Sequence, residues 1–131
     1  MTVRDIHHAQ VTTPLDRLDE LTAFYRDVIG LTPIERPAGN GWRPNGSWFA
    51  LGSRQLHIGV EEGVDRTGTR SHVAYEVDDL AAMLQRLRDA GCVCKTDDEP
   101  GVPKIPGWRR FQTRDPVGNQ VEFVARDPAY A

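Results

Sequence analysis

Cysteine is scarce in this sequence, and no long apolar run occurs in it. Cys92 and Cys94 are the only cysteines, and side chains two positions apart on one strand rarely reach disulfide geometry. Mean hydropathy is -0.50, and no stretch approaches the roughly 20 apolar residues that cross a bilayer. We therefore expect two reduced thiols that pack in the interior, and no membrane partner.

Blocks of one charge are also missing. The 131 residues include 16 basic and 19 acidic side chains, which give a net charge of -3 and are scattered along the chain. No Lys/Arg run is suited to a phosphate backbone, so nucleic acid is not an expected partner. The first residues carry charges without the apolar segment of a secretory signal. These absences lead us to expect a cytoplasmic protein.

The same order of predicted strands and helices occurs twice along the chain. Apolar residues recur at helical spacing over 18–28 and again over 80–87, and each helix is predicted to end at a glycine, Gly30 or Gly91. Asp78 or Asp79 is the expected cap of the second helix. The predicted strands are 6–12, 31–35, 47–51 and 54–60 in the first copy, and 71–77, 92–96, 108–114 and 120–125 in the second.

The repeat predicts an α+β fold. Its two βαβββ modules, about residues 4–62 and 69–127, are expected to close one sheet whose apolar face is covered by the helices. At this length the two modules are expected to make a single domain over residues 1–131.

Four metal-binding residue types occupy matched positions in the two copies. His8 precedes His57 by 49 residues, and His72 precedes Glu122 by 50. Strand alternation places all four side chains on the face opposite the apolar residues of their strands. Imidazole and carboxylate are ligands of Zn²⁺, Ni²⁺, Co²⁺, Mn²⁺ and Fe²⁺. The spacing therefore predicts one divalent metal site made by His8, His57, His72 and Glu122. His7 has the opposite parity and is expected to pack or cap.

Four segments resemble the vicinal oxygen chelate superfamily, which includes glyoxalases, bleomycin-resistance proteins and extradiol dioxygenases. The segments that carry the resemblance are IHHAQV at 6–11, FYRDVIGL at 24–31, SHVAYEVDDL at 71–80 and DPVGNQVEF at 115–123. The resemblance implies a single glyoxalase-like domain whose two modules form a cupped mixed sheet with helices on the outer face. It also implies a homodimer, with modules paired within or across chains. His8, His72 and Glu122 match the family's ligands. His57 departs from the pattern, because glyoxalases have Glu there and epimerases have Gln, so His57 is either a fourth ligand or an acid or base beside an open coordination position.

The resemblance implies a function for the site. The first expectation is a lyase or isomerase that chelates a small substrate through adjacent oxygens, with Glu122 or His57 moving a proton. The alternatives are an extradiol-type dioxygenase that uses Fe(II), a metal-free drug-binding resistance protein, and a fosfomycin-type thiol transferase. The short chain argues against the dioxygenase, the retained ligands against drug sequestration, and the absence of a recognisable phosphonate loop against the transferase.

Hairpin pairing predicts which residues flank the site. A turn at Gly52-Ser53 sets Trp48 opposite His57, and a turn over 115–119 sets Gln112 opposite Glu122 and Arg110 opposite Val124. Residues opposite each other share a sheet face. Trp48, Arg110 and Gln112 are therefore the candidates for substrate binding, with Arg110 expected to hold a carboxylate or phosphonate.

Overall fold

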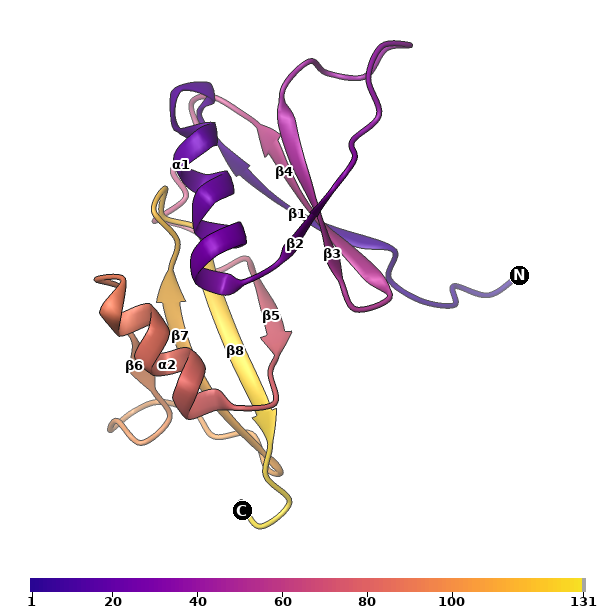
Figure 1. The fold of residues 1–131 in the computed structure, drawn as a ribbon. Coiled ribbons are helices and arrows are strands. Elements are labelled where there is room, and N and C mark those ends of the chain that lie inside the picture. Colours follow the sequence, from indigo (N-terminus) through magenta and orange to yellow (C-terminus); the bar gives the residue numbers. More distant parts are fainter. Residues whose placement is uncertain (131) are drawn as a thin grey trace. The chain divides into compact units, whose positions relative to one another are not determined.

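The computed structural model describes residues 1–130, and the chain divides into two compact units, Met1–Val64 and Asp65–Ala131. Each unit contains one copy of the repeated module (Figure 1). The α+β class and the two βαβββ modules are thus confirmed. The strands hydrogen-bond as two four-stranded sheets, one in each unit. Among residues 1–130, no helix has the length and apolar character needed to cross a membrane.

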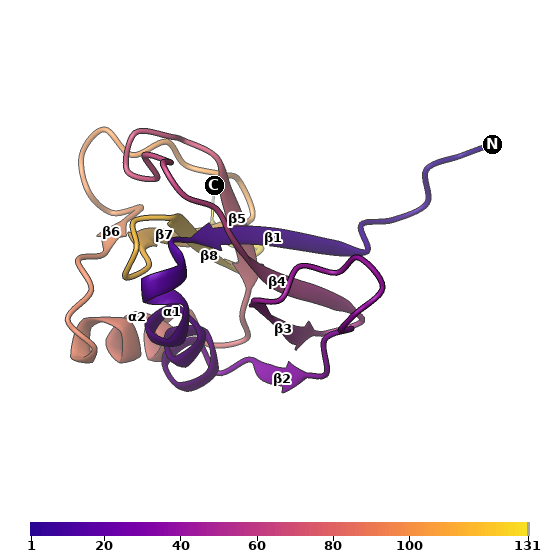
Figure 2. The ribbon, with the colours of Figure 1, turned by 90° about the horizontal axis from the view of Figure 1, so that it is seen from above.

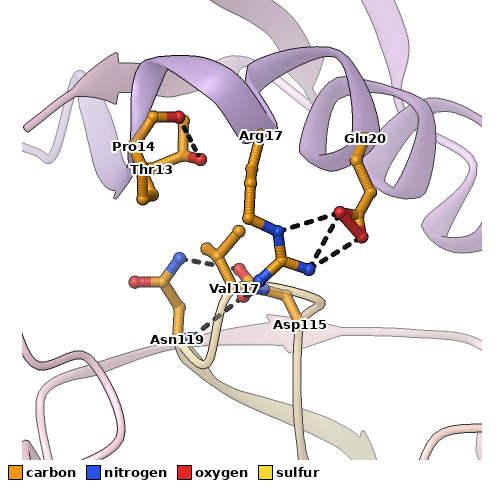
Figure 3. Close-up of polar contacts among 7 residues, drawn as sticks. All are labelled: Thr13, Pro14, Arg17, Glu20, Asp115, Val117 and Asn119. Carbon is orange, nitrogen blue, oxygen red and sulfur yellow. Dashed lines mark hydrogen bonds and ion pairs between the residues drawn. The ribbon is translucent and has the colours of Figure 1, made fainter.

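The first unit is built on a sheet in the order β1-β4-β3-β2. Strands β1 and β4 run parallel and the other neighbours antiparallel, and the N-terminal residues extend beyond the start of β1 (Figure 2). Its elements are β1 (His8–Thr13), a 3-10 turn η1 (Leu15–Arg17), α1 (Leu18–Ala23), η2 (Phe24–Ile29), β2 (Thr32–Ile34), β3 (Gly46–Leu51) and β4 (Arg54–Val60). The exposed start of the helical segment carries an ion pair in which Arg17 donates to Glu20 at 2.8 Å (Figure 3).

The first helix differs from its prediction in its second half. The backbone changes to a π-type helix over Phe24–Ile29, and Tyr25 O accepts from Gly30 N at 3.1 Å, five residues on. Gly30 then ends the helix as predicted, with φ of 90° in the left-handed region. The helix buries Leu21 and Tyr25 completely, and the Tyr25 ring lies 6.4 Å from that of Phe49 on β3. This contact holds the helical segment on the apolar face of the sheet.

The second unit repeats the plan with the sheet order β5-β8-β7-β6. Its elements are β5 (His72–Glu76), α2 (Leu80–Asp89), β6 (Lys95–Thr96), β7 (Trp108–Arg114) and β8 (Gln120–Arg126). Asp79 caps α2 by accepting from Ala82 N at 2.9 Å, and Phe123 is buried at the centre of the sheet with its ring 5.2 Å from Phe111 and 5.6 Å from Tyr75. Aromatic packing therefore dominates this core.

The strand predicted over 92–96 is shorter than expected. Only Lys95 and Thr96 pair with β7. The backbone N–H of Cys92 does not join the sheet, because it donates to Leu87 O at 3.0 Å and so closes the C-terminal end of α2. Cys94 is buried and Cys92 is half-buried, both as free thiols.

The predicted strand registers are confirmed. Trp48 lies opposite His57, Gln112 opposite Glu122, and Arg110 opposite Val124. A tight turn joins β7 to β8. In it the carboxylate of Asp115 accepts from Asn119 N at 2.9 Å and from the Asn119 side chain at 2.8 Å (Figure 3). The turn chemistry fixes the register, and the register decides which side chains meet Glu122.

Candidate metal and substrate site

The first unit presents a stack of three rings on the polar face of its sheet. The imidazole of His57 lies between the indole of Trp48, with centroids 3.8 Å apart and planes at 2°, and the imidazole of His8, at 4.1 Å and 18°. Cross-strand pairing of β3 with β4 sets Trp48 against His57, while β1 brings His8 from the other side. His57 is consequently only 5% exposed, although it is on the face away from the apolar core.

His57 is held as a neutral ring. Its Nε2 lies 2.8 Å from Gln55 Oε1, and because an amide oxygen only accepts, this nitrogen carries the proton. Burial, and then the charges of His8, His7 and Arg36, lower the pKa of His57 from 6.5 to about 4. Nδ1 therefore keeps its lone pair at neutral pH.

The stacking limits how His8 and His57 bind metal. An imidazole lone pair lies in the plane of its ring, so two nearly parallel stacked rings do not both aim a lone pair at an ion between them. In this arrangement His57 adjoins His8 without sharing an ion with it. His7, expected to pack or cap, is instead exposed, and its Nδ1 lies 3.0 Å from His8 Nδ1.

The second unit brings His72 and Glu122 together. His72 Nε2 lies 3.7 Å from Glu122 Oε2, and His72 Nδ1 lies 2.8 Å from the carbonyl of Arg70. The carbonyl accepts, so Nδ1 carries a proton, and in the neutral imidazole Nε2 holds the lone pair that faces Glu122. Two donors that bind one ion at ~2.1 Å across a tetrahedral angle lie ~3.4 Å apart. The pair is therefore close to the spacing that a metal ion needs.

The other oxygen of Glu122 is already held. Oε1 accepts a hydrogen bond from Arg110 Nη1 and another from Gln112 Nε2 at 3.2 Å, and Glu122 is only 6% exposed. Arg110 also donates through Nη2 to Pro103 O. Arg110 and Gln112 are predicted to bind substrate, but here both side chains hold the carboxylate of Glu122.

A pocket of about 900 Å³ opens beside the ring stack in the first unit. Trp42 meets Trp48 edge to face there, with centroids 5.6 Å apart. The pocket is lined by His7, His8, Gln10, Trp42, Trp48 and His57, together with Arg36, Arg43, Glu61, Glu62 and several smaller residues. The sequence pattern does not reveal Arg36 and Arg43 as pocket residues, because no periodicity marks them.

The four predicted ligands thus occur as two pairs, His8 with His57 and His72 with Glu122. Within residues 1–130, no three His, Cys, Asp or Glu side chains form a metal-binding group. The donor chemistry still fits a divalent ion in the second unit, where a free imidazole lone pair and a carboxylate oxygen face each other.

The fold defines a class of protein. The chain belongs to the Glyoxalase/Bleomycin resistance protein/Dioxygenase superfamily, whose family model matches residues 5–123. A search of curated proteins found no match. Among solved structures, a protein of Bacillus anthracis assigned to the glyoxalase family is 31% identical, with a TM-score of 0.83 over 97% of this chain and 98% of that one.

Two more distant structures share the fold. Lactoylglutathione lyase from Agrobacterium tumefaciens is 20% identical, with a TM-score of 0.68 over 95% of each chain. The fosfomycin resistance protein FosX from Listeria monocytogenes, solved with Mn(II) and sulfate, is 16% identical, with a TM-score of 0.71 over 97% of this chain and 93% of that one. At these identities the likeness concerns the fold alone.

Proposed function

We propose that the chain is a metal-dependent lyase or isomerase of the glyoxalase or epimerase type. Its divalent ion, Zn²⁺, Ni²⁺, Co²⁺, Mn²⁺ or Fe²⁺, would be held by His8, His72 and Glu122. The observation that carries this proposal is the approach of His72 Nε2 to Glu122 Oε2 at 3.7 Å, with the imidazole turned by its bond to the Arg70 carbonyl. Such a bond from the other ring nitrogen is the usual support of a ligating histidine.

Catalysis would combine the ion with a proton-transfer group. A divalent ion at this site would polarise two adjacent substrate oxygens as a Lewis acid. We assign the proton transfer to His57, because its Nδ1 lone pair is free while Nε2 is held by Gln55. Its stacked ring supports this role over that of a fourth ligand. Glu122 is the less favoured base, since Arg110 already engages its Oε1.

The substrate would occupy the pocket of the first unit. Trp48 and Trp42 offer apolar walls, and His57 and His8 border the same space. Arg36 and Arg43 supply guanidinium groups there, and a guanidinium fork suits a carboxylate or phosphonate. A small α-oxygenated acid fits these walls.

The active form is proposed to be a homodimer, as the family resemblance implies. Sedimentation or light scattering of the purified chain measures its mass directly, and a monomer at working enzyme concentrations would refute this part of the proposal alone.

The function is tested by metal content and by proton exchange. Protein purified without chelator is expected to hold about one divalent ion per chain, measured by mass spectrometry of the elements. With α-oxygenated acids or thioesters in D₂O, the loaded protein should introduce deuterium at the carbon next to the carbonyl. His57→Gln should lose this exchange while its metal content stays unchanged. Full turnover after complete metal removal would refute the proposal.

The alternatives have their own outcomes in the same experiment. Oxygen consumption with a catechol and Fe(II) would favour the dioxygenase. Tight binding of a cationic drug by metal-free protein would favour sequestration. A covalent thiol adduct of fosfomycin would favour the transferase.

A further inference from the structure

The two carboxylate oxygens of Glu122 have different surroundings. Oε1 accepts from Arg110 and Gln112, whereas Oε2 faces His72 Nε2. We infer that Arg110 is a positioning residue, which occupies Oε1 so that Glu122 binds the ion through Oε2 alone. This inference rests on the proposed function, because it concerns how the proposed ligand is aimed.

Arg110 is fixed in this position from several sides. Its side chain is 10% exposed, Nη1 donates to Glu122, and Nη2 donates to the Pro103 carbonyl. Its backbone N donates to Asp97 Oδ2 at 3.0 Å. To reach a substrate, the guanidinium would have to leave both acceptors and abandon a buried carboxylate. A guanidinium bound in this way belongs to the wall of the site.

The sheet places both donors on the same oxygen. Arg110 and Gln112 stand two residues apart on β7, so they share a face, and Gln112 lies directly opposite Glu122 on β8. The pair of donors therefore approaches Glu122 from one strand, while His72 approaches from β5 on the other side of β8. Glu122 on the central strand β8 therefore has Oε1 bonded to side chains of β7, while its Oε2 faces His72 of β5.

The consequence for chemistry is an open coordination position. A carboxylate that binds through two oxygens fills two positions around an ion, and one that binds through a single oxygen fills one. A substrate chelated through adjacent oxygens needs two positions. By withholding Oε1, Arg110 would keep room for the second substrate oxygen.

The inference is tested with Co²⁺, whose visible absorption reports coordination number. Arg110→Met should bind Co²⁺ roughly 10- to 100-fold more weakly, as loss of an outer partner usually does. Its visible band should also weaken, since Glu122 becomes free to bind through both oxygens. Arg110→Lys keeps the charge but lacks the fork that joins Glu122 and Pro103, so it should behave like Arg110→Met.

Controls separate this inference from stability and from the proposed function. Arg88→Met removes an exposed arginine of α2 in the same unit and should leave the Co²⁺ spectrum unchanged. Gln112→Leu removes the second donor to Oε1 and should shift the spectrum in the same direction if Arg110→Met fails to fold.

The outcomes are distinct. If the wild-type chain binds no Co²⁺, the proposed function fails. If it binds Co²⁺ and neither Arg110→Met nor Gln112→Leu alters the spectrum or affinity, only the inference fails. Restoration by Arg110→Lys, or tighter binding by Arg110→Met, would show that charge outweighs positioning and would also overturn it.

Discussion

Acidification should destabilise the metal-free protein through His57. The unfolded chain would protonate this imidazole near its ordinary pKa of 6.5, whereas burial in the ring stack lowers the pKa to about 4 in the folded protein. Between these two values the unfolded state binds more protons, so the free energy of unfolding falls as pH falls. The loss begins below about pH 6.5 and levels off near pH 4.

The magnitude follows from the two pKa values of His57. Protonation of the unfolded chain alone favours unfolding by about 2 kcal/mol between pH 7 and pH 5. Asp97, whose pKa the Arg109 guanidinium lowers, adds its own loss only at more acidic pH, near the ordinary range of carboxyl groups. The loss of unfolding free energy between pH 7 and pH 5 therefore comes from imidazole groups and not from Asp97.

Urea denaturation of chelator-treated protein at pH 7, 6 and 5 measures this loss. His57→Gln provides the matched control, because it keeps a planar polar side chain but cannot titrate, while His7, His8 and His72 remain in both proteins. The wild-type protein should lose about 2 kcal/mol more than the variant over this range. Equal slopes for the two proteins would refute the reasoning that His57 is buried as a neutral ring.

Three further predictions concern the ligands, the core and one turn. Glu122→Gln should weaken Zn²⁺ binding, measured by calorimetry, by more than the ~10- to 100-fold that loss of an outer partner costs; unchanged affinity would contradict its role as a ligand. Phe123→Ala should lower the free energy of unfolding by about 3–5 kcal/mol and Phe123→Leu by less, because this fully buried ring packs between two aromatic rings; a loss below ~1 kcal/mol for the alanine variant would exclude that packing. Gly30→Ala should lower the free energy of unfolding, measured by thermal unfolding, by about 1–2 kcal/mol, and Gly30→Asn by less, since φ is 90° at this position. An alanine variant as stable as the wild-type protein would contradict the left-handed backbone.

Most of the fold was predictable because strand patterns and turn residues constrain each other. Apolar alternation fixed the buried face of each strand, and the turns at Gly52 and Asp115 then fixed the registers of both hairpins. The short β6 was not predictable from alternation, because Cys92 N is used to close the preceding helix. The π-type turns after Phe24 were missed too, since an apolar stripe does not distinguish one helix type from another.

The candidate site was predictable only as a set of positions. Hairpin pairing predicted Trp48 opposite His57 and Gln112 opposite Glu122, and the registers in the structure agree. The side-chain rotamers and hydrogen-bond partners depend on tertiary packing, which strand parity does not predict. The ring of His57 stacks on that of Trp48, and Arg110 donates to Glu122. Arg36 lies at a loop, where no periodic pattern signals that a side chain faces a pocket.

Each of the two side-chain pairs joins a central strand to a terminal one. His57 and Glu122 stand on β4 and β8, which hydrogen-bond to neighbours along both edges, while His8 and His72 stand on β1 and β5 at the ends of their sheets. A backbone clamped on both edges exchanges its amide protons slowly, whereas an outer strand exposes one edge to solvent. The His72–Glu122 pair would therefore combine a ligand on a fixed central strand with one on a more adjustable outer strand, so that ions of different radius could be accommodated by small shifts of β5 while β8 keeps its place.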